Sequence, residues 1–276
     1  MADIYGSHFQ YGGISSRQKR LIFANAESSR FTPISGSTSG VTVFNKKNLR
    51  RYLVDTDYAD SAISFEVDIV TDDDSCLALS ERREIERWLF NRHVYKKLYI
   101  DPDDDCDDEM YETINGEQKG LYLNCIFRNP EKLEYNGGIV GYRVTLESDS
   151  NMWFQDPVSV TLERNSPGDT FFVDTVTVDT DIDGYTYPTV VINVGERGGT
   201  ISISNASDEP DRYTTLTGIP SNAVIRLNSE LNMINDDYYA KLYHQIFPRL
   251  LNGTNRIYVN GDVSSIVYTF NNRRNF

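Results

Sequence analysis

Cysteine, basic charge and long apolar runs are all scarce in this sequence. The three cysteines, Cys76, Cys106 and Cys125, are odd in number and show no CxxC spacing, so neither a disulfide framework nor a zinc site is indicated. No run approaches the roughly 18 apolar residues that a membrane helix needs, and the N-terminus does not follow the order of a secretory signal peptide. We therefore expect reduced thiols, a soluble protein kept in the cytoplasm, and no membrane partner.

Positive charge is too sparse for a nucleic-acid-binding surface. The chain has 27 Lys and Arg against 41 Asp and Glu, a net charge of -14. Residues 1–150 hold 18 basic and 26 acidic residues, and the remainder holds 9 and 15, so both halves are acidic. Because phosphate backbones attract clustered Lys and Arg, this distribution argues against specific nucleic-acid binding.

Apolar residues are abundant enough to build packed cores. They make up 39% of the chain, and 12% of all residues are aromatic, which argues against global disorder. A length of 276 residues suits one large β domain or two ordinary domains, and we favour two.

One stretch, residues 80–93 (SERREIERWLFNRH), predicts an amphipathic helix. Ile85, Trp88 and Leu89 fall at i, i+3 and i+4, which forms one apolar stripe that must be buried. Ser80 is the expected N-cap. The end charges agree with the helix dipole, since Glu81 and Glu84 come early and Arg92 and His93 come late.

Most of the remaining sequence has the pattern of strands and turns. In residues 62–71 (AISFEVDIVT), apolar residues alternate and put Ile63, Phe65, Val67 and Ile69 on one face. Residues 111–150 predict an antiparallel meander with a turn at residues 136–138. The fold expected for residues 1–153 is a β-sandwich-like domain with one α-helix.

Residues 154–276 are expected to form a second, all-β domain. Short strands at nearly regular spacing, separated by Gly, Pro, Asn and Asp, are typical of a sandwich or barrel. Residues 238–251 are the exception, and we interpret them as a loop with a possible short helix that Pro248 breaks.

The sequence DTDIDG at residues 179–184 matches the opening of a calcium-binding loop. The match is partial, because the twelfth position is Val190 instead of a bidentate Glu and the flanks are strand-like where helices are expected. Asp and Gly are also common at hairpin tips. We favour a turn over a calcium site and expect no bound metal.

An acidic loop spans residues 101–109. Its like charges are explained by a solvated hairpin tip. The alternative is that the loop lines a negatively charged opening in an assembly or binds a cation. Its aspartates are Asp101, Asp103, Asp104, Asp105, Asp107 and Asp108.

No catalytic constellation is recognisable. His8, His93 and His244 are far apart and lack a companion motif, so each is interpreted as structural. The acidic residues are too numerous for one pair to be assigned to glycoside hydrolysis. We expect neither an enzyme nor a cofactor.

The second half is rich in tyrosine, which is typical of interfaces and of surfaces that stack against sugars. Core or rim positions explain most of these residues equally well. The tyrosines concerned are Tyr185, Tyr187, Tyr213, Tyr238, Tyr239 and Tyr243.

The order of these segments resembles the distal tail protein (Dit) family of long-tailed bacteriophages. The first half carries AISFEVDIV, a helix with the pair Trp88-Leu89, KLYI, GLYLNCIF, YRVTLESDS and a WFQDP exit. The second half carries GYTYPTVVINV, TISISN, FPRLLNGTNRIYVNG and a terminal strand, which are similar to the galectin-like half of the family. The resemblance covers nearly the full length.

The resemblance implies a virion structural protein at the phage tail tip, assembled in the host cytoplasm. Its N-terminal domains would form a homo-hexameric ring, with galectin-like β-sandwiches at the periphery. The ring would join the tail tube protein to a hub or tip protein and to a receptor-binding protein. The alternative function is a galectin-type carbohydrate-binding protein that contacts the host cell wall.

Two surfaces acquire roles through the resemblance. The outer face of the helix, with Arg82, Arg83 and Arg87, would contact a neighbouring subunit. The acidic loop at residues 101–109, or the acidic turn at residues 72–74, would face the central channel, where it would repel DNA phosphates.

Overall fold

The chain folds into two compact units, each described by itself. The computed structural model describes residues 8–24, 39–45, 51–58, 62–73, 75–90, 94–100, 111–114, 117–166, 168–181 and 184–274. Unit 1 comprises Met1–Gln155 and Arg274–Phe276, and unit 2 comprises Asp156–Arg273. Within the described residues no helix is long and apolar enough to cross a membrane.

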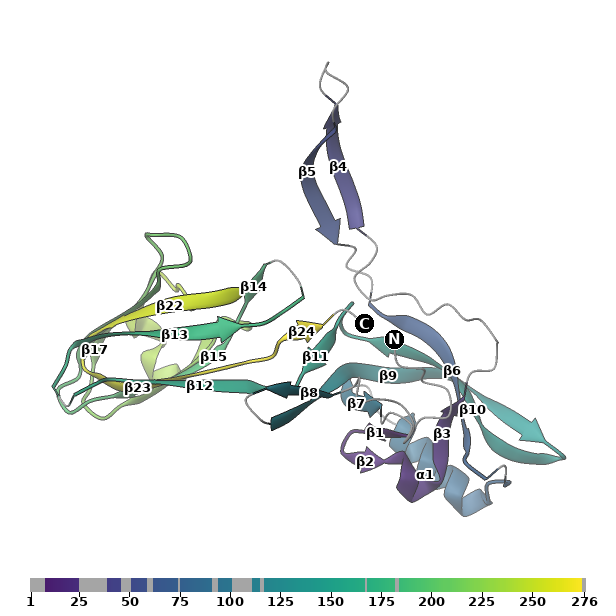
Figure 1. The fold of residues 1–276 in the computed structure, drawn as a ribbon. Helices are drawn as coiled ribbons and strands as arrows, with labels where there is room; N and C mark the ends of the chain where they lie inside the picture. The colour runs from purple at the N-terminus through teal and green to yellow at the C-terminus, as the bar shows by residue number, and fades with distance from the viewer. Residues whose placement is uncertain are drawn as a thin grey trace. The chain divides into compact units, whose positions relative to one another are not determined.

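Unit 1 is built on one large antiparallel sheet (Figure 1). Its described strands are β1 (Phe9–Tyr11), β2 (Ile14–Ser15), β3 (Leu21–Ala24), β6 (Ser64–Thr71), β7 (Lys96–Ile100), β8 (Tyr111–Ile114), β9 (Glu117–Tyr135), β10 (Gly138–Ser148), β11 (Trp153–Gln155) and β24 (Arg273–Arg274). The main path runs β2-β1-β7-β9-β10-β6-β3, while β8 and β11 pair with β9, and β24 pairs with β11. A short 3-10 helix, η1 (Ser16–Lys19), precedes β3.

The predicted meander is present, and its turn has a clear physical cause. Asn136 (φ 47°) and Gly137 (φ 80°) join β9 to β10 with two positive φ angles, the conformation that a tight hairpin requires. Farther along β10, a Cβ on Gly141 would lie 2.1 Å from the Ile69 carbonyl oxygen. Only glycine allows the two strands to approach this closely at that point.

The single described α-helix, α1, spans Leu79–Leu89 and buries the predicted stripe of Ile85, Trp88 and Leu89. The predicted cap was wrong. Ala78 is the N-cap residue, and its backbone N–H donates to the Glu81 carboxylate at 2.8 Å, so the acidic side chain of the first turn takes the role assigned to Ser80.

The predicted end of the helix, at residue 93, was also too late. The helix ends at Leu89, and Phe90, whose N–H donates to the Glu86 carbonyl, is the C-cap. The Phe90 ring packs against Tyr142 at a centroid distance of 5.4 Å. Arg92 and His93 lie outside the described residues.

The core of unit 1 is aromatic where α1 meets the sheet. Phe9 stacks on Phe23 at 4.1 Å and on Trp88 at 5.7 Å, and Tyr11 lies 4.8 Å from Phe127. The Trp88 indole N–H also donates to the Tyr11 carbonyl oxygen at 2.9 Å. This bond satisfies the polar atom of a buried indole and fixes the helix on the sheet.

Two further strands, β4 (Ser39–Asn45) and β5 (Arg51–Tyr58), form an antiparallel hairpin. Among the described strands they pair only with each other.

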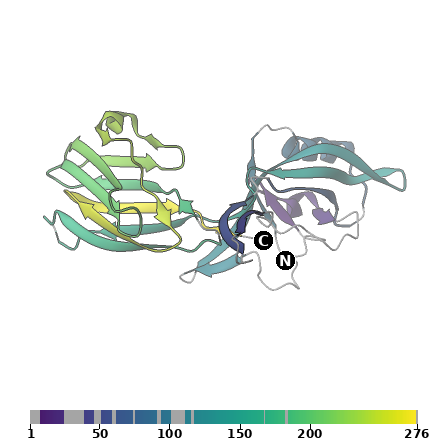
Figure 2. The same cartoon turned by 90° about the horizontal axis from the view of Figure 1, so that it is seen from above.

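Unit 2 is a β-sandwich of two five-stranded antiparallel sheets (Figures 1 and 2). The described strands of sheet 1 are β12 (Val158–Glu163), β23 (Val263–Phe270), β15 (Thr189–Val194), β18 (Val224–Asn228) and β19 (Met233–Ile234), in spatial order. Those of sheet 2 are β13 (Phe171–Val178), β22 (Gly253–Asn260), β16 (Gly199–Asn205), β17 (Tyr213–Ile219) and β20 (Leu242–Tyr243). A small ribbon joins β14 (Tyr185–Thr186) to β21 (Leu250–Leu251).

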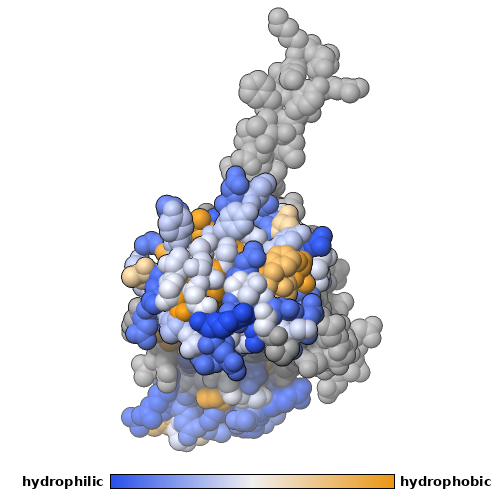
Figure 3. Space-filling view, turned by 90° about the vertical axis from the view of Figure 1, so that its left-hand side faces the viewer, coloured by the Kyte–Doolittle hydropathy of each residue, from blue (hydrophilic) through white to orange (hydrophobic). Residues whose placement is uncertain are grey.

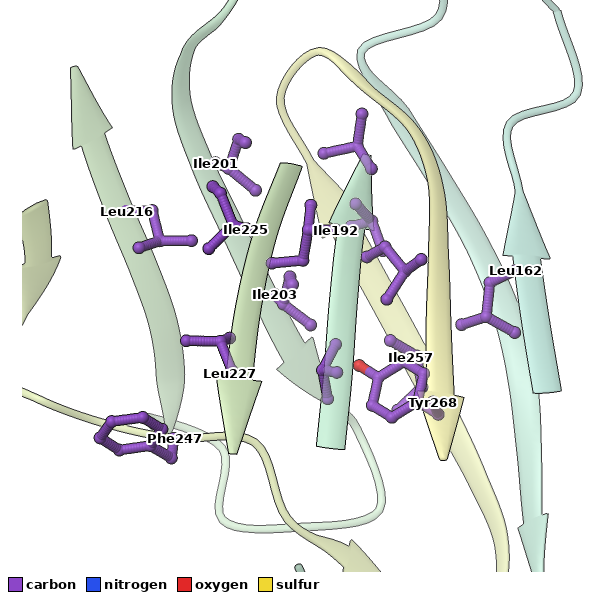
Figure 4. Close-up of a cluster of buried hydrophobic side chains, with 14 of the residues drawn as sticks. Leu162, Ile192, Ile201, Ile203, Leu216, Ile225, Leu227, Phe247, Ile257 and Tyr268 are labelled. Atoms are coloured by element: carbon purple, nitrogen blue, oxygen red, sulfur yellow. The ribbon is translucent and has the colours of Figure 1, made fainter. Parts of the chain in front are cut away.

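The core of unit 2 is mostly aliphatic. Figure 4 shows Ile192 and Ile225 of sheet 1 facing Ile201 and Leu216 of sheet 2, all fully buried. These residues occupy alternate positions on their strands, so the period-two pattern of the sequence specifies which side of each strand is buried.

The predicted mainly β fold class is confirmed, with two compact units and one α-helix among the described residues of the first. The short helix considered for residues 238–251 is also present, as the 3-10 helix η2 (Asp236–Lys241). It ends at Lys241, seven residues before Pro248, so Pro248 is not the residue that ends it.

Candidate functional site

The candidate sites considered first are the surfaces that the sequence singled out. The first is the outer face of α1, where Arg83 and Arg87 are exposed one helical turn apart. Arg82 differs from them because it is half-buried. Its Nε is buried without a hydrogen-bond partner among the described residues. The structure therefore leaves two of the three predicted arginines available at the surface.

Ion pairs join the first turns of α1 and the turn before it to the end of the 3-10 helix η1. Lys19 pairs with Glu84 at 2.7 Å, and Arg20 pairs with Asp73 at 2.9 Å and with Glu81 at 3.0 Å. The hydrogen bond from Lys19 lowers the pKa of Glu84. Hydrogen bonds from Ser75 lower the pKa of Asp73, and Arg20 adds to the effect. The helix carboxylates are thus paired within the unit, which leaves the arginine face with excess positive charge.

Tyr142 lies beneath this helix and joins it to β10. Its hydroxyl donates to the Glu86 carboxylate at 3.0 Å. Burial, together with the neighbouring carboxylate, raises the pKa of Tyr142. The phenol therefore stays neutral and acts as a structural donor.

The predicted acidic surfaces are only partly visible. The loop at residues 101–109, with all six of its aspartates, lies outside the described residues. Asp72 and Asp73 form an exposed turn between β6 and α1, as expected. Asp74 also lies outside the described residues.

The DTDIDG stretch connects β13 to β14, and its residues 182–183 are not described. Asp181 donates its N–H to the Arg273 carbonyl, and Thr180 pairs with Asn252 through both backbone groups. Val190, at the twelfth position, is buried in β15 and has no ligand atom. Groups of three His, Cys, Asp or Glu residues able to hold a metal do not occur in the described part of the chain.

The histidines have separate surroundings. The His8 Nδ1 lies 3.1 Å from the Leu21 carbonyl oxygen, which is a structural contact. His244 lies against the Tyr243 ring at 3.8 Å. His93 is outside the described residues.

Two buried carboxylate clusters in unit 2 are absent from the sequence-based predictions. Asp208 accepts two hydrogen bonds from Arg249, at 2.7 and 2.9 Å. Burial alone would raise the pKa of Asp208, but the hydrogen bonds from Arg249 and from the Glu209 backbone outweigh it and lower the pKa. A cavity of about 20 Å³, room for one water molecule, adjoins this pair.

Asp262 forms the second cluster. It accepts from Arg164 at 2.9 Å and from the backbone N–H of Arg197 at 2.6 Å. Burial again opposes ionisation, and these hydrogen bonds prevail and lower the pKa of Asp262. These partners are 98 and 65 residues away in the sequence, and Arg249 is 41 residues from Asp208, so the sequence offers no local pattern for these pairings. Because all these charges are paired, both clusters hold loops together and offer no free group for chemistry.

The predicted tyrosines divide between structural and exposed positions. Tyr185 lies under the Arg249 guanidinium at 3.7 Å, and Tyr238 packs against the core. Tyr187, Tyr213, Tyr239 and Tyr243 are exposed by 43%, 45%, 51% and 59%. In the space-filling view of Figure 3, apolar residues on the visible face are scattered among hydrophilic ones.

Two Asn-X-Ser/Thr sequons, at residues 205–207 and 252–254, have asparagines with structural contacts. The Asn205 side chain donates to Asn255 at 2.7 Å, and that of Asn252 donates to the Thr180 carbonyl at 2.8 Å. Both amide nitrogens are therefore engaged within the fold.

Comparison with known proteins identifies the same two-part organisation. Residues 4–150 match a family described as a phage tail protein N-terminal domain, and residues 153–269 match a phage tail C-terminal domain. No curated protein matches the sequence.

Solved structures share the fold over almost the whole chain. The Dit protein of phage SPP1, titled a paradigm of the hub adsorption apparatus in phages that infect Gram-positive bacteria, has a TM-score of 0.63 at 11% identity, covering 97% of this chain and 99% of that one. Chains from the phage p2 baseplate in its activated conformation, solved with Sr and with Ca, give TM-scores of 0.52 and 0.51 at 8% identity, each covering 98% of this chain and 99% of that one. The resemblance to distal tail proteins is thereby confirmed at the level of the fold.

Proposed function

This chain belongs to the family of phage tail proteins, and from that premise we propose that it is a distal tail adaptor, a non-enzymatic protein that joins the tail tube to the tail tip or baseplate. The observation that carries the proposal is the combination of the family match with a fold shared end to end with the SPP1 Dit protein. Because that structure spans both units, it supports an equivalent role for the whole chain rather than for one domain.

The proposed assembly is a hexameric ring formed by unit 1, with unit 2, a sandwich of galectin type, at the periphery. A ring closes when identical heterologous interfaces are repeated around a rotation axis. Obligate interfaces of this kind typically bury about 2,000 Å² or more. The buried surface then provides the free energy that fixes the adaptor.

The β4–β5 hairpin supports the proposal that adjacent subunits contact each other. Its strands pair only with each other among the described strands. An isolated two-stranded hairpin is at best marginally stable in water. Contact with an adjacent subunit would stabilise it.

The arginine face of α1 suits one side of a subunit interface. Arg83 and Arg87 are exposed and positive in a chain whose net charge is -14. An acidic surface of the next subunit is the complementary partner, and such charges guide orientation more than they add affinity. Arg82 would contribute less because it is already half-buried.

The remaining parts of the proposal concern the channel and the partners. The acidic loop at residues 101–109 would face the central channel, where repulsion of phosphates prevents DNA from adhering during ejection. The partners would be the tail tube protein, a hub or tip protein and a receptor-binding protein. Assembly would take place in the host cytoplasm.

Size-exclusion chromatography with light scattering and negative-stain microscopy test the proposal. We expect a sixfold ring whose mass is six times that of the 31.5 kDa chain, formed alone or on addition of tail tube and hub proteins. A strict monomer in the presence of both partners would contradict the ring. Rings with the acidic loop on the outer rim would contradict the channel assignment alone.

A further inference from the structure

The outer face of sheet 2 carries aromatic residues in two rows that run across the strands. The first row joins all five strands through paired positions and consists of Phe171, Asn260, Ser202, Thr215 and Tyr243. Neighbouring positions along these strands, such as Phe172 and Leu242, are buried, so this row faces away from the core. Phe171 and Tyr243, at its two ends, are 50% and 59% exposed.

The second row lies beside the first and carries its aromatic rings on β22 and β17. It consists of Val173, Tyr258, Ser204 and Tyr213. Tyr258 lies 6.1 Å from Phe171, so the two rings form one aromatic group on β13 and β22. Tyr213 and Tyr243 lie farther along the same face, Tyr213 two residues before Thr215 on β17 and Tyr243 paired with Thr215 from β20. Hydroxyl side chains separate these two tyrosines from the Phe171–Tyr258 group.

The face is almost uncharged. Of the described outward positions on these five strands, Arg256 alone carries a charge, and its guanidinium lies 5.4 Å from the Tyr258 ring. A polyanion would require several cations, and a basic partner would require carboxylates. In a chain with 41 acidic residues, a face without them fits a neutral ligand.

The distribution of polarity separates a sugar from a protein partner. Protein interfaces usually place apolar and aromatic residues at the centre and polar residues at the rim. Here the order is reversed, with Ser202, Ser204 and Thr215 at the centre and rings on both sides. Hydroxyl groups can bond to sugar hydroxyls, while the C–H faces of sugar rings stack on aromatic rings.

The distance between the aromatic residues also agrees with an oligosaccharide ligand. Tyr258 and Tyr213 are separated by two strand positions, about 10 Å, since neighbouring strands lie about 4.8 Å apart. The outer face of sheet 1 offers no such arrangement, because its paired outward residues include Ser159, Thr269, Thr189 and Asn228 without an aromatic ring.

We propose that the outer face of sheet 2 in unit 2 is a binding site for a neutral oligosaccharide, held between Phe171 and Tyr258 on one side and Tyr213 and Tyr243 on the other. This site goes beyond the adaptor function and does not depend on ring formation. It would give the tail tip a weak contact with uncharged surface glycans, and repetition around an oligomer would strengthen that contact.

Saturation-transfer NMR on the full chain tests the site, with maltotriose, cellotriose and triacetylchitotriose as neutral probes and a heparin-derived disaccharide as the charged probe. We expect transfer to at least one neutral trisaccharide at millimolar concentration. The signal should fall severalfold in the double variant Tyr213→Ala/Tyr243→Ala and remain in Tyr213→Phe/Tyr243→Phe, which keeps both rings. Tyr135→Ala is the matched control, because Tyr135 is 60% exposed in unit 1.

Several results would overturn the proposal. These are no transfer to any neutral trisaccharide, transfer only to the heparin fragment, or a signal that the double alanine variant does not change. If the same variant instead blocks assembly with tail partners, the face is a protein interface. Thermal unfolding of each variant verifies the fold, and light scattering reports ring formation separately, so the failure of one proposal is distinguishable from the failure of the other.

Discussion

The two units bury their sheets by different means. In unit 1 a single helix covers part of one sheet, and Trp88 contributes both a stacked ring and a hydrogen bond to Tyr11. In unit 2 each sheet covers the other, and the contacts are spread over many aliphatic side chains. The first arrangement depends on a few large residues, whereas the second distributes the same hydrophobic stabilisation.

Replacing Trp88 with Ala should have the largest effect. The indole is 7% exposed, so its removal should cost about 3 to 5 kcal/mol in the free energy of unfolding. Hydrogen exchange read separately for each unit should show loss of protection in unit 1 and none in unit 2. Leu79→Ala, at a position 65% exposed on the same helix, is the control and should be nearly neutral. A neutral effect of Trp88→Ala would show that the helix is peripheral.

Breaking the Asp208–Arg249 pair should be the largest single change in unit 2 that leaves its aliphatic core intact. Asp208→Ala leaves a guanidinium that is only 13% exposed without its main partner, at a cost of about 2 to 4 kcal/mol. Chemical denaturation measures the loss. Asp174→Ala, at an exposed edge position, is the comparison. Equal stability of the two variants would show that water replaces Asp208 as the partner of Arg249 at little cost.

Acid should destabilise unit 2 only at low pH. The pKa values of Asp208 and Asp262 are lowered by folding, so their contribution is present above the unfolded pKa of about 3.9 and is lost as pH falls through the lower folded pKa. We expect these groups to change the melting temperature of unit 2 little down to about pH 4. Below that pH the melting temperature should fall. Asp262→Asn should make this loss of stability at low pH smaller. A loss centred near pH 6 would implicate other groups.

The smallest effect on stability is expected at the arginine face of α1. Arg83→Glu/Arg87→Glu changes two exposed side chains, so the free energy of unfolding should shift by less than about 0.5 kcal/mol per site. Ring formation, measured by light scattering, should weaken because the charge at the proposed interface is reversed. Arg226→Glu, on the exposed face of β18, is the matched control. Unchanged assembly would remove α1 from the interface.

The sequence predicted local structure better than it predicted ends and partners. The alternation of Val67 and Ile69 located β6, and the stripe of Ile85 and Trp88 located α1. The cap was wrong because the Glu81 carboxylate accepts from the Ala78 N–H, and the helix ends at Leu89, four residues before the predicted end. Helix ends are set by cap geometry, which helix propensity does not contain.

Buried charge was the least predictable feature. Asp68 lies in an alternating strand yet is buried, because Arg143 directly opposite on β10 pairs with it at 2.9 Å. The pairing of Asp208 with Arg249 crosses 41 residues, and that of Asp262 with Arg164 crosses 98. Such pairs follow from strand register and loop packing, which a single sequence does not reveal.

The sequence by itself determined the periodicities, and with them the mainly β class, the one helix and the resemblance to phage distal tail proteins. The reason is that the side-chain periodicities of strands and helices are set by neighbours within a few residues. Only the tertiary structure decided which residues share a surface. Phe171 and Tyr243 are far apart in the chain, and they end the same row because β22, β16 and β17 lie between them in a fixed register.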